Sequence, residues 1–336
     1  MDVAIERRSL RLKAPLRTAF GDVRTRELLE VRVSDGELTG VGEAAPLEAY
    51  DGVPLDAVRE ALEACRPLLE GGSPGEREEV IDACWLEAGI AQAVAAIDVA
   101  LWDLEGRRAG VPVAALLAPE PAAAVPVNAT IAAEDRAGAA AAAGAARAAG
   151  FRCVKVKLGV GDDAGRLAAV RATAGAGMLI RGDANGAWDV AGAIAALERL
   201  APVGFELVEE PVHGVRELRT VREQVPVPLA MDETAADPGA AASGATDAVC
   251  LKIARCGGIS GLIATAEAAR GAGSFVYVAS TLDGPVGIAA ALHAAAALGR
   301  LPPCGLATLD VFEGVTPLPV RDGAIAPPPG PGLGVP

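Results

Sequence analysis

The chain has 336 residues, of which 51% are hydrophobic and 22% are charged, and its formal net charge is −14. This length and apolar content are enough for a large core, and they predict two domains or one large α/β barrel with an addition. The acidity argues against nucleic acid and anionic membrane surfaces as partners, because both bind basic patches. A small acidic substrate is compatible with this charge if a metal ion screens it.

Cysteine and histidine usage narrows the chemistry further. Six cysteines are spread along the chain without a CxxC pair, which favours buried, reduced thiols over a zinc site or a disulfide framework. Only two histidines are present, His213 and His293, which disfavours paired-histidine mechanisms and histidine-rich metal sites. His293 lies in an alanine-rich helical pattern and is expected to be a helix residue. His213 follows the segment EEPV in a loop and is expected to be solvated or to support a neighbour.

The N-terminal segment MDVAIERRSLRLKAP lacks the apolar core of a signal peptide, and no apolar run approaches the roughly 18 residues of a membrane span. We therefore expect a cytoplasmic protein without a membrane partner. Its expected partner is a small-molecule carboxylate substrate, with a homo-oligomer as an open option.

The first part of the chain has the pattern of an α+β domain. Residues 2–43 alternate like an antiparallel sheet, and the turn segment SDG at 34–36 separates two of its strands. After a loop rich in proline and glycine, the apolar spacing becomes helical over residues 55–70 and 90–110. A sheet followed by helices predicts a separate α+β capping domain.

From about residue 125, short apolar runs alternate with alanine-rich helical segments such as 137–150, which is typical of βα units and a parallel sheet. Strand ends are expected near Ile131, Lys157, Asp183, Val208, Asp232, Lys252 and Ser280. This spacing is close to the roughly 30 residues per unit of an eight-fold barrel. The predicted fold class is therefore α/β, a modified (β/α)8 TIM-type barrel with an N-terminal α+β capping domain.

These patterns also predict the domain limits. We assign residues 1–122 to the capping domain, joined by the C-terminal segment 310–336, and residues 123–309 to the barrel. The proline-rich end, residues 327–336, is expected to be an extended tail.

Carboxylates follow several of the apolar runs at the end where the active site of a β/α barrel forms. The run MLIRGDAN contains Asp183, FELVEEPV contains Glu209 and Glu210, and PLAMDET contains Asp232 and Glu233. Carboxylates that meet in one volume repel one another unless a cation binds them, and oxygen ligands without histidine or cysteine fit Mg²⁺. We expect Asp183, Glu209 and Asp232 as metal ligands. Glu210 and Glu233 stay open as alternatives to their neighbours, because sequence specifies register poorly.

Lysines lie on strands to either side of these acids, Lys157 before them and Lys252 after them. A lysine in water has a pKa of about 10.4, but a divalent metal and a second ammonium nearby would lower it into the range of a base. Two such groups suit removal of an α-proton from a metal-bound carboxylate, because the metal and the remaining cation stabilise the enediolate. Asn185 is expected to hydrogen-bond nearby. A single acid or lysine at a strand end is usually a cap or an ion-pair member, so the prediction rests on five successive strands.

These residues belong to a longer series of motifs that resembles the enolase superfamily, in its muconate-lactonizing-enzyme-like subgroup with two catalytic lysines. The series covers essentially the whole chain and runs as GEAAPLEAYDG (42–52), AIDVALWDLEGRRAGVPVAALL (96–117), KVK, DANGAW, VEEPV, DET, LKIARCGG and STLDGPVGIAAAL. The resemblance implies a modified barrel, a cap built from both termini, and Mg²⁺, for which Mn²⁺ can substitute. The missing barrel histidine argues against the mandelate-racemase-like branch.

The resemblance also implies roles for single residues. The three expected ligands match the metal ligands of the family. Lys157 matches one acid/base, and Lys252 matches the lysine on the opposite face of the substrate. Lys155 matches the lysine that supports Lys157, whose pKa its ammonium would help lower.

Among the reactions of the subgroup, the resemblance favours o-succinylbenzoate synthase, which dehydrates a cyclohexadiene carboxylate by syn elimination in menaquinone biosynthesis. The segments VASTLDGPVGIAAAL and CGLATLDVFEGVTPLPVRDG are similar to actinobacterial members. In this interpretation Lys157 removes the α-proton and returns it to the departing hydroxide, while Lys252 stabilises the enediolate as a cation.

The alternative reaction is dipeptide epimerisation, with both lysines as bases on opposite faces. Such enzymes usually carry Asp-x-Asp near the end of the barrel, where this chain has Thr308-Leu309-Asp310. N-succinylamino acid racemisation and cycloisomerisation suit the same lysine pair. A sugar-acid dehydratase would lack its usual histidine base here, and a non-catalytic scaffold is disfavoured because none of the expected site residues is lost.

Substrate contacts are expected in the cap segments 17–26 and 43–52, which would close over the barrel mouth as lids. Arg17, Arg24 and Arg26 are candidate partners for a distal carboxylate of the substrate. The other expected substrate contacts are Tyr50, Asp51, Ser280, Asp283 and Asp310.

Overall fold

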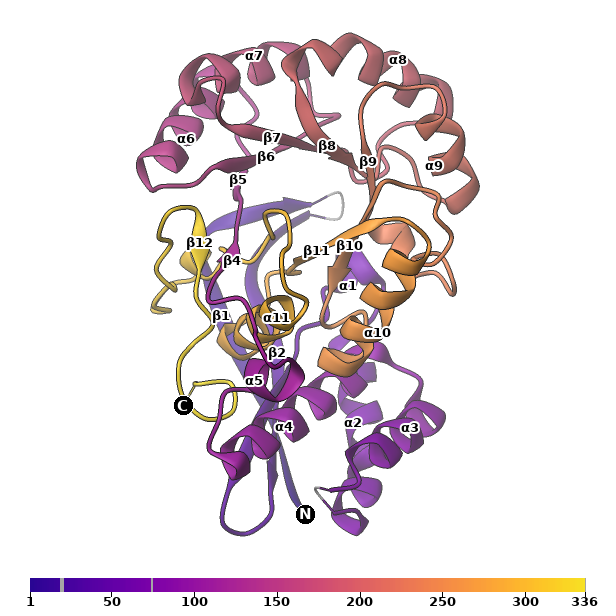
Figure 1. The fold of residues 1–336 in the computed structure, drawn as a ribbon, viewed down its shortest axis with the longest axis vertical. Helices are drawn as coiled ribbons and strands as arrows, with labels where there is room; N and C mark the ends of the chain where they lie inside the picture. Colours follow the sequence, from indigo (N-terminus) through magenta and orange to yellow (C-terminus); the bar gives the residue numbers. More distant parts are fainter. Residues whose placement is uncertain (19–20, 74, 336) are drawn as a thin grey trace.

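The structure, a computed structural model, describes residues 1–18, 21–73 and 75–335. In Figure 1 an antiparallel sheet with its helices lies below a curved parallel sheet that is wrapped by helices on its outer side. The lower part is the capping domain and the upper part is the barrel. None of the described helices is both long enough and apolar enough to span a membrane.

The capping domain begins with the predicted antiparallel sheet, whose strands pair in the order β1-β2-β3. Its elements are β1 (Asp2–Thr18), β2 (Gly21–Ser34), β3 (Thr39–Ala44), α1 (Glu48–Asp51), α2 (Leu55–Gly71), α3 (Arg77–Ala88), α4 (Ala91–Ala109) and α5 (Val113–Leu117). The turn between β2 and β3 is stabilised by Asp35, whose side chain accepts hydrogen bonds from the backbone N–H groups of Glu37 and Leu38. The turn expected from the segment SDG is therefore present.

Helix α4 is buried along most of its length because β3 approaches it very closely. A Cβ atom at Gly40 would lie 2.0 Å from the carbonyl oxygen of Ala100, and one at Gly42 would lie 1.8 Å from that of Ala96. Only glycine allows this approach. The close packing holds α4 between the cap sheet and the barrel.

The barrel contains seven parallel strands that pair in chain order. They are β5 (Ala129–Ile131), β6 (Cys153–Lys157), β7 (Leu179–Asp183), β8 (Phe205–Glu209), β9 (Leu229–Met231), β10 (Ala248–Lys252) and β11 (Phe275–Ala279). Their ends agree with the expected strand ends to within one residue. The ring is completed by Cys304 and Gly305, which form parallel bridges to Val127 and Ala279. This short segment stands where the eight-fold pattern leads one to expect an eighth full strand.

Helices connect most of the strands, and the alanine-rich segment predicted as a helix is α6. The barrel helices are α6 (Arg136–Ala148), α7 (Asp163–Ala174), α8 (Val190–Leu200), α9 (Val215–Arg222), α10 (Gly258–Gly271) and α11 (Pro285–Ala297). Asp135, Asp162 and Asp189 cap α6, α7 and α8 by accepting a backbone N–H three residues on. Between β9 and β10, a stretch described throughout, the chain forms the short 3-10 helix η2 (Glu233–Ala236) and turns instead of an α-helix.

The C-terminal segment returns to the capping domain. Phe312 bridges Leu12 of β1, and the backbone N–H of Leu333 donates to the buried Asp103 of α4 (2.7 Å). Strand β12 (Ala324–Ile325) pairs with β4 (Val125–Pro126) at the start of the barrel. The tail thus lies packed on the protein, and the division of the chain at residue 122 stays a prediction.

His293, considered in the sequence as a helix residue, serves the internal packing. His293 is buried in α11, where its Nδ1 accepts from the Ala114 N–H (3.2 Å) and its Nε2 lies 3.2 Å from the Leu333 carbonyl oxygen. Burial lowers its pKa, so the ring is neutral and Nε2 is the donor. It is a helix residue of the core, as the sequence indicates.

Arg26 of β2 joins the cap to the barrel. Its side chain is buried, and the guanidinium donates to the carbonyl oxygens of Pro46 (2.7 Å) and Ala45 (2.9 Å) in the cap and of Thr281 (3.2 Å) and Leu282 (3.3 Å) in the barrel. Arg26 therefore joins the two domains. Its N–H groups bind backbone carbonyls, so it does not have the substrate-binding role that the sequence suggested.

Two buried carboxyl groups lie beside Arg26. Glu43 of β3 accepts a hydrogen bond from the Gly284 N–H (2.6 Å), and Asp283 lies next to it. Burial raises the pKa of Glu43 to about 8, and the nearby Asp283 carboxyl adds to the effect. Burial also raises the pKa of Asp283 to about 6, although Arg26 opposes the shift.

We predict that Glu43→Gln makes the protein more resistant to alkaline pH. Because the pKa of Glu43 is raised from 4.5 to about 8 on folding, the folded state binds the proton more tightly, and this stabilisation is lost as pH rises through that range. Glutamine keeps an acceptor for the Gly284 N–H and carries no charge. Thermal melts between about pH 6 and about pH 9 should show a smaller fall of Tm in the variant. Glu37→Gln, at an exposed site in the turn between β2 and β3, should melt like the natural chain, and an unchanged pH dependence in Glu43→Gln would contradict the assignment.

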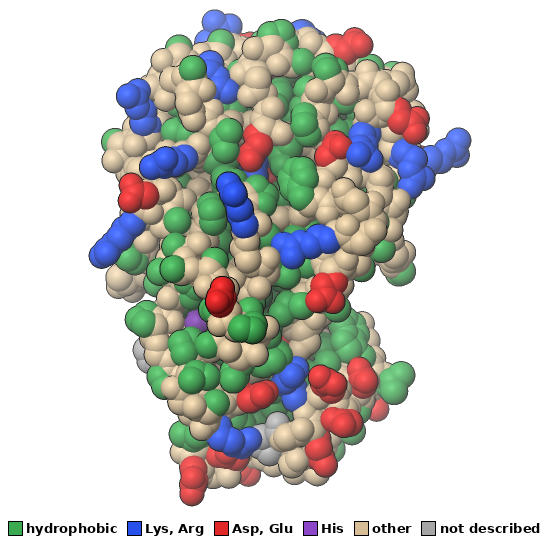
Figure 2. Space-filling view, viewed as in Figure 1, with side chains coloured by type: hydrophobic (Ala, Val, Ile, Leu, Met, Phe, Trp, Pro, Cys, Tyr) green, Lys and Arg blue, Asp and Glu red, His purple; other side chains and the backbone are tan. Residues whose placement is uncertain are grey.

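The outer surface is mixed in charge. On the face shown in Figure 2, acidic side chains gather over the capping domain, while lysine and arginine side chains are spread among apolar ones over the barrel. Helix α3 alone carries Glu78, Glu79, Asp82 and Glu87. This face offers no continuous basic surface of the kind that nucleic acids bind.

Candidate active site

The three acids expected as metal ligands lie at the carboxyl ends of three neighbouring strands. Asp183 ends β7, Glu209 ends β8 and pairs with it in register, and Asp232 directly follows β9. Their exposed fractions are only 8%, 1% and 3%. Three carboxylates held together away from water repel one another and need positive charge close by.

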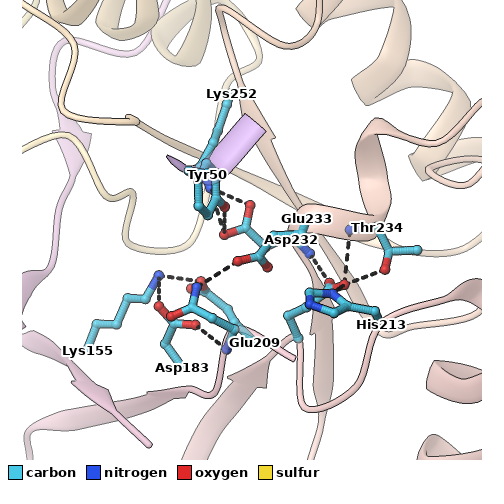
Figure 3. Close-up of polar contacts among 11 residues, drawn as sticks. Tyr50, Lys155, Asp183, Glu209, His213, Asp232, Glu233, Thr234 and Lys252 are labelled. Atoms are coloured by element: carbon cyan, nitrogen blue, oxygen red, sulfur yellow. Dashed lines mark hydrogen bonds and ion pairs between the residues drawn. The ribbon is translucent and has the colours of Figure 1, made fainter. Parts of the chain in front are cut away.

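Lys155 of β6 supplies part of this charge. Its ammonium lies 3.0 Å from Asp183 Oδ2 and donates to Glu209 Oε2, as Figure 3 shows. Burial by itself would lower the pKa of Lys155, but Asp183, Glu209 and Asp232 outweigh this effect and raise it well above its usual range. Lys155 is therefore a fixed cation that bridges the acids of β7 and β8.

Lys252, the last residue of β10, supplies charge from the other side. Its ammonium donates to both carboxylate oxygens of Asp232, at 2.6 Å for Oδ2, and to the hydroxyl of Tyr50 at 2.5 Å (Figure 3). Burial would raise the pKa of Asp232, but Lys252 outweighs it and holds that pKa at about 2. Asp232 in turn raises the pKa of Lys252 against the effect of burial.

The carboxylates of the chain thus raise the pKa of Lys155 and Lys252. The lowered pKa that the sequence predicts for Lys157 and Lys252 depends on a bound divalent cation and stays a prediction. A divalent cation bound by the same carboxylates would neutralise the charge that causes the upward shift.

Lys157 differs from these two lysines. It lies two residues after Lys155 on the same face of β6, and it pairs in register with Asp183. Its side chain is half-buried, and its ammonium forms no hydrogen bond or ion pair with any residue that the structure describes. The three lysines therefore divide into two that are bound to carboxylates and one that is not.

Tyr50 of the short helix α1 completes the site from the capping domain. Its hydroxyl donates to Asp232 Oδ2 (2.9 Å), and the centre of its ring is 4.5 Å from the Lys252 ammonium and 4.4 Å from the Arg255 guanidinium. Arg255 also lines a cavity of about 420 Å³ that reaches Asp232 and Lys252 between η2 and α10. The sequence did not single out Arg255, because it carries no local pattern that marks it.

The structure also shows what the two alternative acids contact. Glu210 turns to the loop after β9, where its carboxylate accepts from the backbone N–H groups of Asp232 (2.8 Å) and Thr234 (3.0 Å) and lies 3.0 Å from Nδ1 of the exposed His213. Glu233 accepts from the Asn185 side chain (2.7 Å).

Glu210 therefore braces the loop that carries Asp232, while Glu209 faces the acid cluster. The backbones of Asn185 and Glu210 both have positive φ angles, 45° and 38°. Non-glycine residues in this region are strained, and such strain concentrates at functional sites.

The remaining expected substrate contacts are dispersed. Asp51 accepts from the N–H groups of Leu47 and Val53 and from the side chain of Gln92, each at 3.1 Å, so it holds the cap loop. The Ser280 hydroxyl lies 3.0 Å from that of Thr308 at the end of β11. Asp283 is buried beside Arg26, while Asp310 and Arg24 are exposed, the former in η3 (Leu309–Val311). The Arg17 side chain lies outside the described residues.

The donor set fits a hard divalent cation. Single ligand atoms of Glu209, Asp232 and Cys250 lie within 4.8 Å of one another, and Lys155 links Asp183 to this group. Burial raises the pKa of the Cys250 thiol well above its usual range, so the thiol stays protonated and is a poor ligand. The remaining ligands are carboxylate oxygens, which Mg²⁺ prefers.

Comparison with known families identifies the chain. Residues 138–336 match the family described as Enolase C-terminal domain-like, and residues 1–118 match the N-terminal domain of mandelate racemase and muconate lactonizing enzyme. This chain is a member of the enolase superfamily. Its relatives place it in the muconate-lactonizing-enzyme-like subgroup, so the fold expected from the sequence is confirmed, and the protein is an enzyme of the lyase or epimerase type.

Individual relatives of this enolase-superfamily enzyme carry the names of three different activities. It is 45% identical over 113 residues to the o-succinylbenzoate synthase of Mycobacterium tuberculosis, an alignment of 32% of this chain and 34% of that protein. The matched part thus spans about a third of the length of such relatives.

Solved structures match over the whole chain. A dipeptide epimerase from Enterococcus faecalis V583, complexed with Mg and the dipeptide L-Leu-L-Tyr, has a TM-score of 0.91 and 27% identity, covering 99% of this chain and 98% of that one. An N-succinyl Arg/Lys racemase from Bacillus cereus has a TM-score of 0.93 and 25% identity, covering 99% and 94%.

We predict that Mg²⁺ stabilises the natural protein and fails to stabilise Glu209→Gln. The variant removes one carboxylate of the cluster, while a ligand present at about 100 times its Kd adds about 2.7 kcal/mol of stability. Thermal melts with and without Mg²⁺, together with titration calorimetry, measure the difference. Glu206→Gln is the matched control, because Glu206 lies on the same strand and pairs with Arg181 (2.7 Å) away from the cluster. A full Mg²⁺ response in Glu209→Gln would remove Glu209 from the ligand set.

Proposed function

We propose that this enzyme removes the α-proton of a carboxylate substrate and that the reaction is the syn dehydration of o-succinylbenzoate synthase. The observation that carries the proposal is the division among the lysines. Lys157 has an ammonium bound to no described residue, whereas Lys252 is bound to Asp232 and Tyr50 as a cation. A reaction with one base and one stabilising cation needs this asymmetry.

The proposed roles follow from these contacts. Asp183, Glu209 and Asp232 hold Mg²⁺, which supplies Lewis-acid stabilisation of the charge that develops on the substrate carboxylate. Mn²⁺ is proposed to substitute because it also accepts oxygen ligands. Lys157 takes the α-proton and gives it to the departing hydroxide on the same face.

Lys252 and Lys155 remain protonated in this proposal. Each ammonium donates to a carboxylate oxygen, Lys252 to Asp232 and Lys155 to Glu209, and these contacts favour the charged form of both lysines. Lys252 faces the developing enediolate from the side opposite Lys157, and Lys155 keeps the acids of β7 and β8 together. Tyr50 closes the site from the cap and excludes water beside Lys252.

Dipeptide epimerisation is the second candidate, supported by the similarity to the E. faecalis epimerase over the whole chain. It requires Lys252 to act as a second base. The N-succinylamino acid racemase reaction makes the same demand and has similar support from the B. cereus structure. The binding of Lys252 by two oxygens of Asp232 favours the cationic role and therefore the dehydration.

The cytoplasmic location is also a proposal, supported by six free cysteines.

We predict that the protein consumes the cyclohexadiene substrate of o-succinylbenzoate synthase in a Mg²⁺-dependent manner, and that Lys157→Ala lowers kcat about 10²–10⁴-fold. Loss of the substrate chromophore measures turnover, first with Mg²⁺ and then with a chelator. Lys13→Ala, at an exposed lysine of β1, is the matched control and should keep full activity.

Two results would change the assignment. Full activity in Lys157→Ala would overturn the one-base mechanism. Absence of turnover together with exchange of an α-proton in deuterated water, on dipeptides or N-succinylamino acids, would instead support epimerisation or racemisation.

A further inference from the structure

The backbone at Lys157 is held on one side only by strand pairing. Lys157 is the last residue of β6, and on the β7 side its neighbour Leu158 donates a hydrogen bond to the carbonyl oxygen of Asp183 (2.6 Å). On the other side β5 ends at Ile131, which pairs with Val156, so the strand register stops one residue before Lys157. The carbonyl of Lys157 therefore needs a donor from elsewhere.

Arg166, in the first turn of α7, supplies that donor. Its side chain is completely buried, and its Nη2 donates to the Lys157 carbonyl oxygen (2.7 Å) and to Asp163 Oδ1 (2.6 Å). Its Nη1 donates to the carbonyl oxygen of Ala133, two residues beyond the end of β5 (3.2 Å). One guanidinium thus replaces the missing strand contact between β5 and the end of β6.

Asp163 extends the same support into the loop that follows Lys157. Its second oxygen, Oδ2, accepts from the backbone N–H of Gly159 (2.9 Å), which has a φ of 75°. The guanidinium keeps one buried donor, Nε, without a partner, which costs free energy. A buried arginine with an unsatisfied donor lowers stability, so its presence calls for an explanation. The group that it binds is the backbone of Lys157, the lysine without a described partner.

We propose that Arg166 is a positioning residue for Lys157, a role that rests on the proposed function of Lys157 as the base. A displacement of about 1 Å at a reacting group is enough to lower a rate about 100-fold. Loss of the Arg166 contacts frees the end of β6 from β5 and α7, so that only the pairing with β7 holds Lys157 and the place of its amine in the site changes. The acids of β7, β8 and β9 keep their own supports.

The test compares Arg166→Lys with Arg171→Lys. Arg171 lies on the same helix and also binds backbone carbonyls, those of Gly175 (3.0 Å), Met178 (2.6 Å) and Val203 (3.2 Å), but at the far end of α7. Both variants should lower Tm. Only Arg166→Lys should lower kcat, by about 10–100-fold, with KM and the Mg²⁺ affinity unchanged and with a larger isotope effect for an α-deuterated substrate.

A second readout does not depend on the reaction. The chain has four lysines, so ¹³C-methylation of their amines gives few NMR signals, and the Lys157 signal is identified by its loss in Lys157→Ala. Arg166→Lys should shift this signal, Asp163→Asn should shift it less, and Arg171→Lys should leave it in place. If the natural protein turns over no candidate substrate, the proposed function fails while this signal still tests the positioning. An unmoved Lys157 signal, or equal loss of kcat in both arginine variants, would overturn the inference.

Discussion

The site depends on one electrostatic constraint: three carboxylates from neighbouring strands occupy a volume that water hardly reaches. Removing a charge from water costs several kcal/mol, and three charges of the same sign add mutual repulsion to that cost. The chain meets this cost with buried ammonium groups, Lys155 against Asp183 and Glu209, and Lys252 against Asp232. These contacts favour the charged forms of Asp232, Lys155 and Lys252, whereas burial raises the pKa of Glu209.

The fold gives these charges their geometry. Parallel strands that pair in chain order bring their carboxyl ends to one edge, and the ring closes through two residues of a short bridging segment. The capping domain then adds what the barrel lacks. Tyr50 contacts Asp232 and Lys252. Arg26 binds both the cap loop that leads to Tyr50 and the barrel loop after β11. Cap and barrel therefore form one site, although each has its own sheet.

The contrast among the three lysines links this architecture to chemistry. A lysine locked to a carboxylate serves as a cation, whereas a lysine without a partner can exchange a proton. The proposed dehydration uses one lysine as a base and the alternative epimerisation uses two, so the contacts of Lys252 bear directly on the choice between them. Lys252 and Lys157 are the same type of side chain and differ in their neighbours, because Asp232 and Tyr50 bind Lys252.

The sequence by itself determined the parallel strands, the cap, and the acids and lysines at strand ends, because apolar periodicity and the polar residue that ends each run are local properties of the chain. The tertiary structure alone decided which member of the pair Glu209 and Glu210 faces the barrel, since both are buried and alternation does not say which face is which. It also decided that Asp51 and Arg26 bind backbone groups of the cap loops, and that Arg166 supports Lys157. Such contacts join residues far apart in the chain or across a loop, and no local pattern records which carbonyl a buried guanidinium will meet.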